Sequence, residues 1–355
     1  MECGIIGPPA AGKSALFSAL TGVPLPEAGH SRRETQRGVA KLTDQRLVSL
    51  AQIAHSAKIA PAAIEYVDVP GAVVSSDKRE PYPTAILTEL RTTSLLVLVL
   101  RDFPLRGANP TAPAQDLAAV ELEFIVNDLA VTEKRLERLA KQHDPLYRQE
   151  AELLERCRQT LNAEIPLRRL QFDVEVEKIL RGFSFLSVKP LLIVLNISED
   201  EITNADTRLA NLRNSYTQDQ TAMAWTAVSA EIEAEIAQLD EVEREPFRRD
   251  LGLGNPASER IMRAAFDLLG LITFFTANEK DAAARLIKAG SNALAAAYAV
   301  HNDIGRGFIR AEVCHSADLI RAGSLHKLKE EGKLRLEGRD YIVQDGDVIY
   351  IRFNV

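Results

Sequence analysis

Four mostly apolar runs stand out along the chain, and they are continuous rather than alternating. They are residues 3–6, 63–67, 95–100 and 191–195. Strands that are buried on both faces of a parallel sheet have this pattern, whereas half-exposed strands alternate apolar and polar residues. The segments between the runs show helical spacing, as in residues 15–20. The pattern therefore predicts an α/β fold with a mostly parallel sheet.

The spacing of apolar residues changes between about Asp116 and Leu180. They recur there at three- and four-residue steps, with a break at residues 143–145 (His-Asp-Pro), where proline cannot continue a helix. The apolar positions are Leu122, Ile125, Leu129, Leu136 and Leu139 before the break and Leu146, Leu154, Cys157 and Leu161 after it. This predicts a long antiparallel helical hairpin inserted into the α/β domain. Its acidic and basic residues balance, which is compatible with a solvated surface or with a partner-docking arm.

A third pattern begins near Thr276. Residues 341–343 and 348–353 are apolar runs around the turn Gln344-Asp345-Gly346-Asp347, which predicts a β-hairpin. Residues 307–311 suggest a further strand, and residues 316–331 a helix. The C-terminal part thus reads as a small α+β module.

These changes of pattern divide the chain into four segments. Residues 1–127 and 187–275 form the two parts of one α/β domain, residues 128–186 the helical insert, and residues 276–355 the C-terminal module.

Composition narrows the class of protein. The chain has 355 residues, is 46% hydrophobic and 26% charged, and has a net charge of −7, so a folded protein is expected. It lacks the overall basic charge of a general DNA binder. The run at 95–100 is too short to span a membrane, and no signal peptide precedes it. Three widely spaced cysteines indicate reduced thiols, so we expect a cytoplasmic protein with neither membrane nor DNA as partner.

The most specific motif follows the first predicted strand. Residues 7–14 read Gly-Pro-Pro-Ala-Ala-Gly-Lys-Ser, a G-x-x-x-x-G-K-S phosphate loop between a strand and a helix. Its backbone N–H groups and the helix N-terminus bind phosphates, Lys13 reaches the β- and γ-phosphates as the catalytic lysine, and Ser14 binds Mg²⁺. The predicted nucleotide-binding residues here are Pro9, Ala10, Ala11, Gly12, Lys13, Ser14 and Ala15.

A second motif, Asp68-Val69-Pro70-Gly71, directly follows the run that ends at Val67. In P-loop NTPases a carboxylate at this place holds the Mg²⁺ shell, and the glycine N–H binds the γ-phosphate. Asp68 is therefore a predicted metal ligand and Gly71 a predicted nucleotide contact.

A third motif, Asn196-Ile197-Ser198-Glu199, follows the fourth run, at the place where GTPases carry N-K-x-D. The aspartate of that motif accepts hydrogen bonds from guanine, whereas adenine presents an acceptor to it. Glu199 is one methylene longer and Ile197 replaces the lysine, so both weaken a guanine interpretation. Ser229 and Ala230 stand where GTPases place a base-contacting turn. We therefore predict that Asn196, Ile197, Glu199, Ser229 and Ala230 form the base site.

With these motifs in place, the chain resembles the Obg-like ATPases, the YchF family, over nearly its whole length. Further matching segments are residues 3–5, 233–239, 251–253, 273–277, 307–311, 338–348 and 353–355. The resemblance implies a Ras-like P-loop domain, an α-helical insert and a C-terminal TGS module of β-grasp type. It also implies ATP preferred over GTP, slow hydrolysis with Mg²⁺, and association with the ribosome or its large subunit through the insert and the TGS module.

The chain departs from the family pattern where catalysis depends on switching. Ala72 follows the D-x-x-G motif, and no histidine occurs from Arg101 to Asp116. Arg32 occupies the place of the switch threonine, so Thr35, three residues further on, is the remaining candidate for the Mg²⁺ shell. Residues 79–83 (Arg-Glu-Pro-Tyr-Pro) replace a glycine-rich second switch with two prolines.

These departures leave three interpretations open. The first is an ATP-binding protein with slow or lost hydrolysis that contacts the translation machinery. The second is a non-catalytic, nucleotide-binding adaptor with degenerate switches. The third is a GTP-binding translation factor, against which Glu199 argues.

Overall fold

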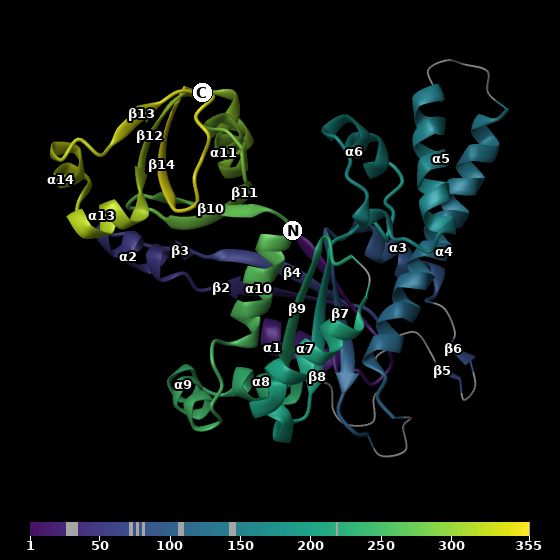
Figure 1. Cartoon of the computed structure of the whole chain (residues 1–355). Helices are drawn as coiled ribbons and strands as arrows, with labels where there is room; N and C mark the ends of the chain where they lie inside the picture. Colours follow the sequence, from purple (N-terminus) through teal and green to yellow (C-terminus); the bar gives the residue numbers. More distant parts are fainter. Residues whose placement is uncertain are drawn as a thin grey trace. The chain divides into compact units, whose positions relative to one another are not determined.

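The computed structural model of the chain (Figure 1) describes residues 1–25, 35–70, 74–75, 78–79, 82–105, 110–141, 147–217 and 219–354. Their contacts group into two compact units. The first unit comprises Met1–Ala40 and Glu65–Ala264, and the second Lys41–Ile64 and Ala265–Val355.

A six-stranded sheet forms the centre of the first unit, in the order β2-β4-β1-β7-β8-β9 (Figure 1). The strands are β1 (Glu2–Ile6), β2 (Gln36–Leu42), β4 (Ala62–Asp68), β7 (Leu95–Asp102), β8 (Leu191–Ile197) and β9 (Met223–Val228). Within this order, β4 pairs parallel with β1, β1 with β7, β7 with β8 and β8 with β9. The four continuous apolar runs are thus confirmed as strands of a parallel sheet, and the predicted fold class is confirmed.

Helices connect the strands of this sheet or follow the last of them. They are α1 (Lys13–Thr21), α3 (Thr84–Thr92), α7 (Ala205–Ser215), α8 (Ala230–Gln238), α9 (Glu241–Asp250) and α10 (Ala257–Leu268). Every residue of β8 is buried, and Leu191, Ile193 and Leu195 pack in one apolar core with Leu96 and Leu98 of β7. Two short strands, β5 (Val74–Ser75) and β6 (Lys78–Arg79), pair with each other.

The helix that leads into the insert starts in the core of the first unit, before the predicted boundary of the insert. Helix α4 (Pro113–Leu139) is one continuous element, and the predicted domain boundary at residue 128 falls within it. Its first half contributes Leu117 and Val120 to the sheet core. Its second half lies beside α5 (Arg148–Asn162), as Figure 1 shows. The short helices η2 (Leu167–Arg169) and α6 (Val174–Arg181) complete the insert.

The apolar face predicted for the second helix of the insert is largely confirmed. Leu154, Cys157 and Leu161 of α5 are buried in a cluster with Ile125 and Leu139 of α4. The predicted break at 143–145 and Leu146 lie outside the described residues.

A buried carboxylate fixes the base of the insert. Asp128 accepts hydrogen bonds from the backbone N–H groups of Leu186 (3.0 Å) and Ser187 (2.7 Å), where the chain leaves the insert. The guanidinium of Arg91 on α3 lies 3.7 Å from the same carboxylate. Burial raises the pKa of Asp128, against the opposing effect of these N–H donors. The carboxylate thus joins the two ends of the insert.

We expect Asp128→Asn to lower the free energy of unfolding by about 2–3 kcal/mol, because one oxygen remains for two buried N–H groups and Arg91 loses its counter-charge. Urea unfolding measures this change. The matched control is Glu175→Gln, which removes an exposed partner of Lys178 and should change stability by less than about 0.5 kcal/mol. Equal, small losses in the two variants would contradict the assignment.

The second unit is built on a mixed sheet with the order β13-β12-β14-β10-β11-β3. Its strands are β3 (Ile59–Ala60), β10 (Leu271–Ala277), β11 (Ala282–Lys288), β12 (Phe308–His315), β13 (Arg335–Glu337) and β14 (Asp347–Phe353). Strands β10 and β11 form an antiparallel hairpin, and β14 pairs parallel with β10 and antiparallel with β12. Helix α11 (Ala293–Val300) packs on this sheet through Ala293, Ala296 and Ala297, and α12 (Asn302–Arg306) follows it. This is the β-grasp arrangement implied by the resemblance.

The hairpin predicted around residues 344–347 is wrong. Residues 348–353 lie in β14, but both neighbours of β14 are other strands, β10 and β12. Residues 341–343 instead run beside the start of α11, where the Val343 N–H donates to Ser291 O. The turn itself exists, because Gly346 has φ 84° and the Asp347 carboxylate accepts from the Gln344 N–H. Partners distant in sequence therefore outweigh a favourable local turn.

The other predictions for this region hold with one adjustment. The strand at 307–311 is confirmed as the start of β12. The helix predicted at 316–331 forms as α13 (Ser316–Ala322) and α14 (Leu325–Glu330). Gly323, with φ 74°, ends α13, and the hydroxyl of Ser324 caps α14.

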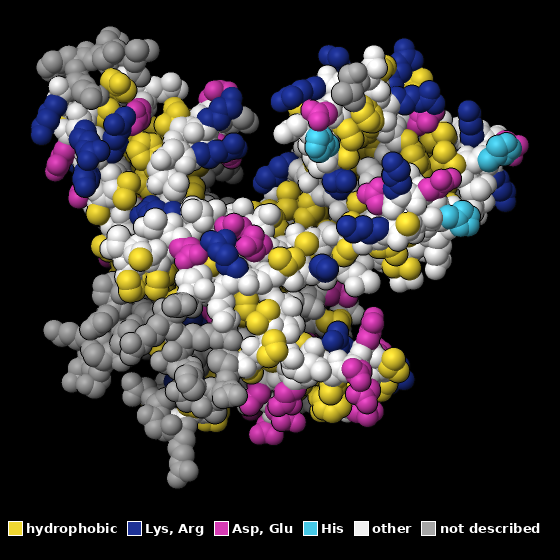
Figure 2. All heavy atoms as spheres, turned by 180° about the vertical axis from the view of Figure 1, so that it is seen from behind, with side chains coloured by type: hydrophobic (Ala, Val, Ile, Leu, Met, Phe, Trp, Pro, Cys, Tyr) yellow, Lys and Arg dark blue, Asp and Glu magenta, His cyan; other side chains and the backbone are white. Residues whose placement is uncertain are grey.

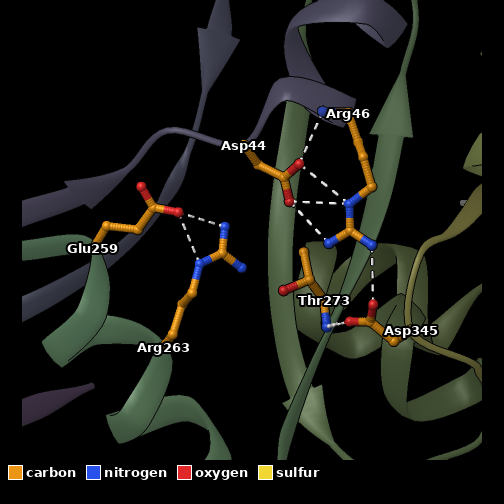
Figure 3. A network of polar contacts seen from close by, with 6 residues as sticks. All are labelled: Asp44, Arg46, Glu259, Arg263, Thr273 and Asp345. Carbon is orange, nitrogen blue, oxygen red and sulfur yellow. Dashed lines mark hydrogen bonds and ion pairs between the residues drawn. The ribbon is translucent and has the colours of Figure 1, made fainter. Parts of the chain in front are cut away.

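Residues 41–64, predicted as part of the α/β domain, pack within the second unit. Helix α2 (Gln45–Ile53) is capped by Asp44, which binds Arg46, and Arg46 reaches Asp345 at 2.9 Å. Figure 3 shows this network and the hydrogen bond from the Thr273 N–H to Asp345. It also shows a separate pair on α10, Glu259 with Arg263. The domain boundaries proposed from the sequence stay predictions.

None of the helices in the described part of the chain combines the length and apolarity needed to cross a lipid bilayer.

Candidate nucleotide-binding site

The phosphate loop (residues 7–14) connects β1 to α1 at the carboxyl edge of the parallel strands. Gly7 has φ 147°, and a Cβ there would lie 2.2 Å from the carbonyl oxygen of Val99 on β7. Gly12 has φ 90°, and a Cβ there would lie 2.1 Å from Nδ2 of Asn196. Only glycine fits either position, so the loop takes its shape from close packing against the neighbouring strands.

The start of α1 is suited to an anion. Gly12 is its N-cap and offers no side-chain acceptor, and the first turn contains no acidic residue. The first N–H groups of a helix lack intrahelical partners, and the helix dipole adds positive potential there. Pro9 and Ala10 are exposed, Gly12, Ser14 and Ala15 are half-buried, and Ala11 is buried.

Lys13 is held in the loop by backbone carbonyls. Its Nζ donates to Gly7 O at 3.1 Å and to Pro8 O at 2.9 Å. The residue is only 8% exposed. Burial lowers the pKa of Lys13 to about 8, although the Asp68 carboxylate opposes this shift. The negative charge of a bound phosphate would therefore stabilise the protonated form of Lys13.

Ser14 and Asp68 come together from α1 and β4. The hydroxyl of Ser14 donates to Oδ2 of Asp68 at 3.0 Å, and Asp68 is buried. A hydroxyl and a carboxylate are the hard oxygen donors that Mg²⁺ prefers, and the ion usually takes one or two such side chains together with phosphates and water. No cluster of three or more His, Cys, Asp and Glu ligands occurs among the residues that the structure describes. The pair fits Mg²⁺ that is bound together with a nucleotide.

Asn196 connects the phosphate loop to the base-side loop. Its Nδ2 donates to Ala11 O at 2.9 Å, and its Oδ1 accepts from the Ala230 N–H at 2.9 Å. Asn196 is 4% exposed. One side-chain amide thus links Ala11 and Ala230, which lie 185 and 34 positions from Asn196 in the sequence.

The rest of the predicted base site surrounds this amide. Ser229 is buried and is the N-cap of α8, and Ile197 is buried at the end of β8. Glu199 begins the short helix η3 (Glu199–Asn204) and is exposed. Asn196, Ile197 and Ser229 are thus buried, whereas the carboxylate of Glu199 beside them is accessible to a ligand.

One predicted residue, Thr35, does not join this arrangement in the structure. The hydroxyl of Thr35 donates to Glu89 of α3 at 2.8 Å, so it is engaged away from Ser14 and Asp68. Gly71 lies outside the described residues, as do Arg32 and Ala72.

One residue at the site had no sequence signal. Tyr82 lies in the segment that replaces the glycine-rich switch, yet its hydroxyl contacts Gly7 of the phosphate loop. A tyrosine between two prolines matches no phosphate-loop motif, so only the fold reveals this contact.

Two family models match the chain. The model of a 50S ribosome-binding GTPase (MMR_HSR1) covers residues 2–136. The model of the C-terminal part of YchF GTPases, described as a protein of unknown function, covers residues 271–354.

Curated relatives match over the full length. The chain is 35% identical to the ribosome-binding ATPase YchF of Bacillus subtilis (strain 168), with 100% of each chain covered. It is 36% identical to the protein of the same name from Escherichia coli O157:H7, with 100% of this chain and 99% of the relative covered. Among solved structures, the Schizosaccharomyces pombe YchF GTPase matches with a TM-score of 0.85 over 99% of this chain and 97% of that chain, at 22% identity. That last likeness concerns the fold.

Proposed function

The chain belongs to the YchF family of P-loop NTPases, and from this premise we propose that it binds ATP with Mg²⁺, hydrolyses it slowly and associates with the ribosome. The observation that carries the proposal is the convergence of Lys13, Ser14 and Asp68 at one loop. A buried ammonium, a hydroxyl and a carboxylate are the groups needed to bind a triphosphate and its metal ion.

Each of these groups has a separate role in the proposed complex. The ammonium of Lys13 neutralises charge on the β- and γ-phosphates, and the backbone N–H groups that open α1 bind their oxygens. Ser14 and Asp68 hold Mg²⁺, directly or through water. When bound, the ion neutralises the charge that develops on the phosphate oxygens.

Preference for ATP rests on the base site. The relatives' names do not agree on the nucleotide, since those from Bacillus and Escherichia are called ATPases and that from Schizosaccharomyces a GTPase. In this chain the buried Ile197 takes the place of a lysine, and Glu199 stands at an exposed rim. The aspartate of the GTPase motif accepts two hydrogen bonds from guanine. The longer side chain of a glutamate is less well placed to accept both.

The double variant Ile197→Lys with Glu199→Asp tests this base argument. We expect the ratio of the dissociation constants for GTP and ATP to shift toward GTP by about tenfold, as for one or two hydrogen bonds to a charged group. Isothermal titration with both nucleotides measures the ratio. The control is Glu201→Asp, an acidic residue two positions along η3, which should leave the ratio unchanged. An unchanged ratio in the double variant would refute the proposed base contact.

Slow hydrolysis follows from the groups at hand. Phosphoryl transfer depends on positioning the attacking water and on balancing charge. The residue after the D-x-x-G motif is Ala72, and the segment from Arg101 to Asp116 contains no histidine. The sequence therefore provides groups that bind the triphosphate, but it has no polar side chain at position 72 and no histidine in the segment 101–116 to orient the attacking water.

Association with the ribosome is proposed from the family and from two surfaces. Helix α4, which leads into the insert, exposes Leu122 and Val126. On the second unit, a groove of about 500 Å³ contains the cations Arg310, Lys329, Arg335 and Arg352 among the apolar residues Ile309, Leu334 and Leu336, with Glu312 beside them. Figure 2 shows Lys and Arg side chains interspersed with apolar ones on one face of the second unit.

This mixture of cations and apolar side chains suits ribosomal RNA or a ribosomal protein. From a partner of this kind we infer a cytoplasmic protein. Co-sedimentation with whole ribosomes and with separated subunits tests the association and identifies the subunit.

A further inference from the structure

The hydroxyl of Tyr82 makes two hydrogen bonds to a single residue of the phosphate loop. It accepts from the Gly7 N–H at 3.0 Å and donates to the Gly7 carbonyl at 3.1 Å. The same carbonyl accepts from Nζ of Lys13 at 3.1 Å. Gly7 is buried, so its polar groups depend on protein partners rather than on water. The hydroxyl of Tyr82 and the ammonium of Lys13 therefore share one acceptor.

Tyr82 is held firmly enough for this contact to be maintained. Its side chain is 3% exposed and lies in the apolar core that includes Leu87 of α3 and Leu117 of α4. Its N–H donates to the carboxylate of Glu123 on α4. Pro83 follows as the N-cap of α3, and a residue before proline has restricted backbone freedom. Withdrawing the hydroxyl would thus require unpacking of the core.

The shared acceptor links Tyr82 to the position of Lys13. An ammonium has three donors, and two of them go to the carbonyls of Gly7 and Pro8. Lys13 can therefore bind phosphate oxygens while it keeps these carbonyls, and its position depends on where the Gly7 carbonyl lies. Because the hydroxyl of Tyr82 holds both polar groups of Gly7, it fixes that carbonyl and, through it, the ammonium.

We propose that Tyr82 is a positioning residue for triphosphate binding: it fixes the Gly7 peptide and, through the shared carbonyl, holds the ammonium of Lys13 where it can reach the phosphates. This inference rests on the proposed function, because it concerns the same loop. It assigns a role to a residue of the segment that departs from the family pattern at positions 79–83.

Tyr82→Phe tests the role, because it removes one oxygen and keeps the ring. We expect the dissociation constant for ATP with Mg²⁺ to rise about tenfold, because the buried Gly7 N–H loses its acceptor and the Gly7 peptide that positions Lys13 is no longer fixed. Isothermal titration is carried out at a temperature where circular dichroism shows that both proteins are fully folded. A merely structural tyrosine would change the unfolding midpoint and leave the affinity of the folded protein unchanged.

The matched control is Tyr66→Phe. Tyr66 is a fully buried tyrosine on β4, and among the described residues its hydroxyl has no hydrogen-bond partner. Removing that oxygen should leave the affinity for ATP as it was. A tenfold loss in Tyr82→Phe alone supports the inference. No loss in Tyr82→Phe, or an equal loss in both variants, overturns it and leaves the proposed function intact if the unmodified protein binds ATP. Failure of the unmodified protein to bind either ATP or GTP overturns both.

Discussion

Lys13→Met is expected to weaken ATP binding by at least about 100-fold, because it removes a charge that makes strong hydrogen bonds to phosphate oxygens. The same change should leave the free protein equally stable or more stable. The ammonium of Lys13 is buried, and burial lowers its pKa to about 8. Methionine fills the space of the apolar stem without that charge. A loss of ATP affinity without a loss of stability distinguishes this lysine from one with a structural role.

The pH dependence supplies an internal check on this prediction. The folded pKa of Lys13, about 8, lies below the ordinary value of 10.5, so between these values the unfolded chain binds more protons than the folded one. The stability contributed by this residue should therefore rise as pH rises from about 8 toward 10.5. ATP binding should weaken over the same range, because the ammonium loses its proton.

Titrations and urea unfolding between pH 7 and pH 10 measure both effects. Lys13→Met should lack the fraction of each slope that Lys13 contributes. Lys41→Met, on β2, is the control for removal of a lysine that is exposed, and it should keep both slopes. A Lys13→Met protein that binds ATP normally would contradict the site.

Asn196→Asp is expected to destabilise the free protein by about 3–5 kcal/mol, the range for an uncompensated buried charge. One carboxylate oxygen can still accept from the Ala230 N–H. The other replaces an amide that donates to Ala11 O, so two acceptors would face each other in a buried site. The phosphate loop should lose its support from β8, and ATP affinity should fall with it.

Acid should partly rescue this variant. Burial raises the pKa of a carboxyl, so a buried aspartate at position 196 takes up a proton as the pH falls and can then donate to Ala11 O. Urea unfolding at pH 7 and pH 5 should show a smaller difference from the unmodified protein at pH 5. The control is Asn204→Asp at an exposed position of η3. A loss below about 1 kcal/mol at position 196 would show that the amide does not bridge the loops.

The strands and the phosphate site could be predicted because their determinants are local. A parallel strand with both faces buried must be apolar throughout, and β7 and β8 satisfy this rule almost residue by residue. The motifs at Lys13, Asp68 and Asn196 each follow such a strand. The carboxyl ends of parallel strands lie at one edge of a sheet, so these residues converge.

The wrong hairpin prediction and the contacts that the sequence did not reveal both involve residues that lie far apart in the sequence. The turn at residues 344–347 looked like a hairpin, but β14 is paired instead with β10 and β12, which lie about 75 and 40 residues earlier. Arg46 binds Asp345 across 299 positions, and Tyr82 binds Gly7 across 75. No local spacing encodes such contacts.

One of the segments that match the family has a structural role. Glu233, in the family segment 233–239, is buried and forms an ion pair with Arg248 at 2.7 Å. It also accepts from the Ala257 N–H at the start of α10, while Arg248 donates to Gly254 O. The glutamate thus anchors the loop that contains the family segment 251–253. Sequence resemblance marked the position, but only the structure gives the reason for it.

The central claim is that the chain binds ATP in preference to GTP, with Mg²⁺, and turns it over slowly. The most direct measurement is a titration of the unmodified protein with ATP and GTP, with and without Mg²⁺, followed by phosphate release under the same conditions. We expect tighter binding of ATP, strengthened by Mg²⁺, and release of phosphate much slower than the typical enzyme range of about 1–1,000 per second. Preference for GTP, or no binding of either nucleotide, would contradict it.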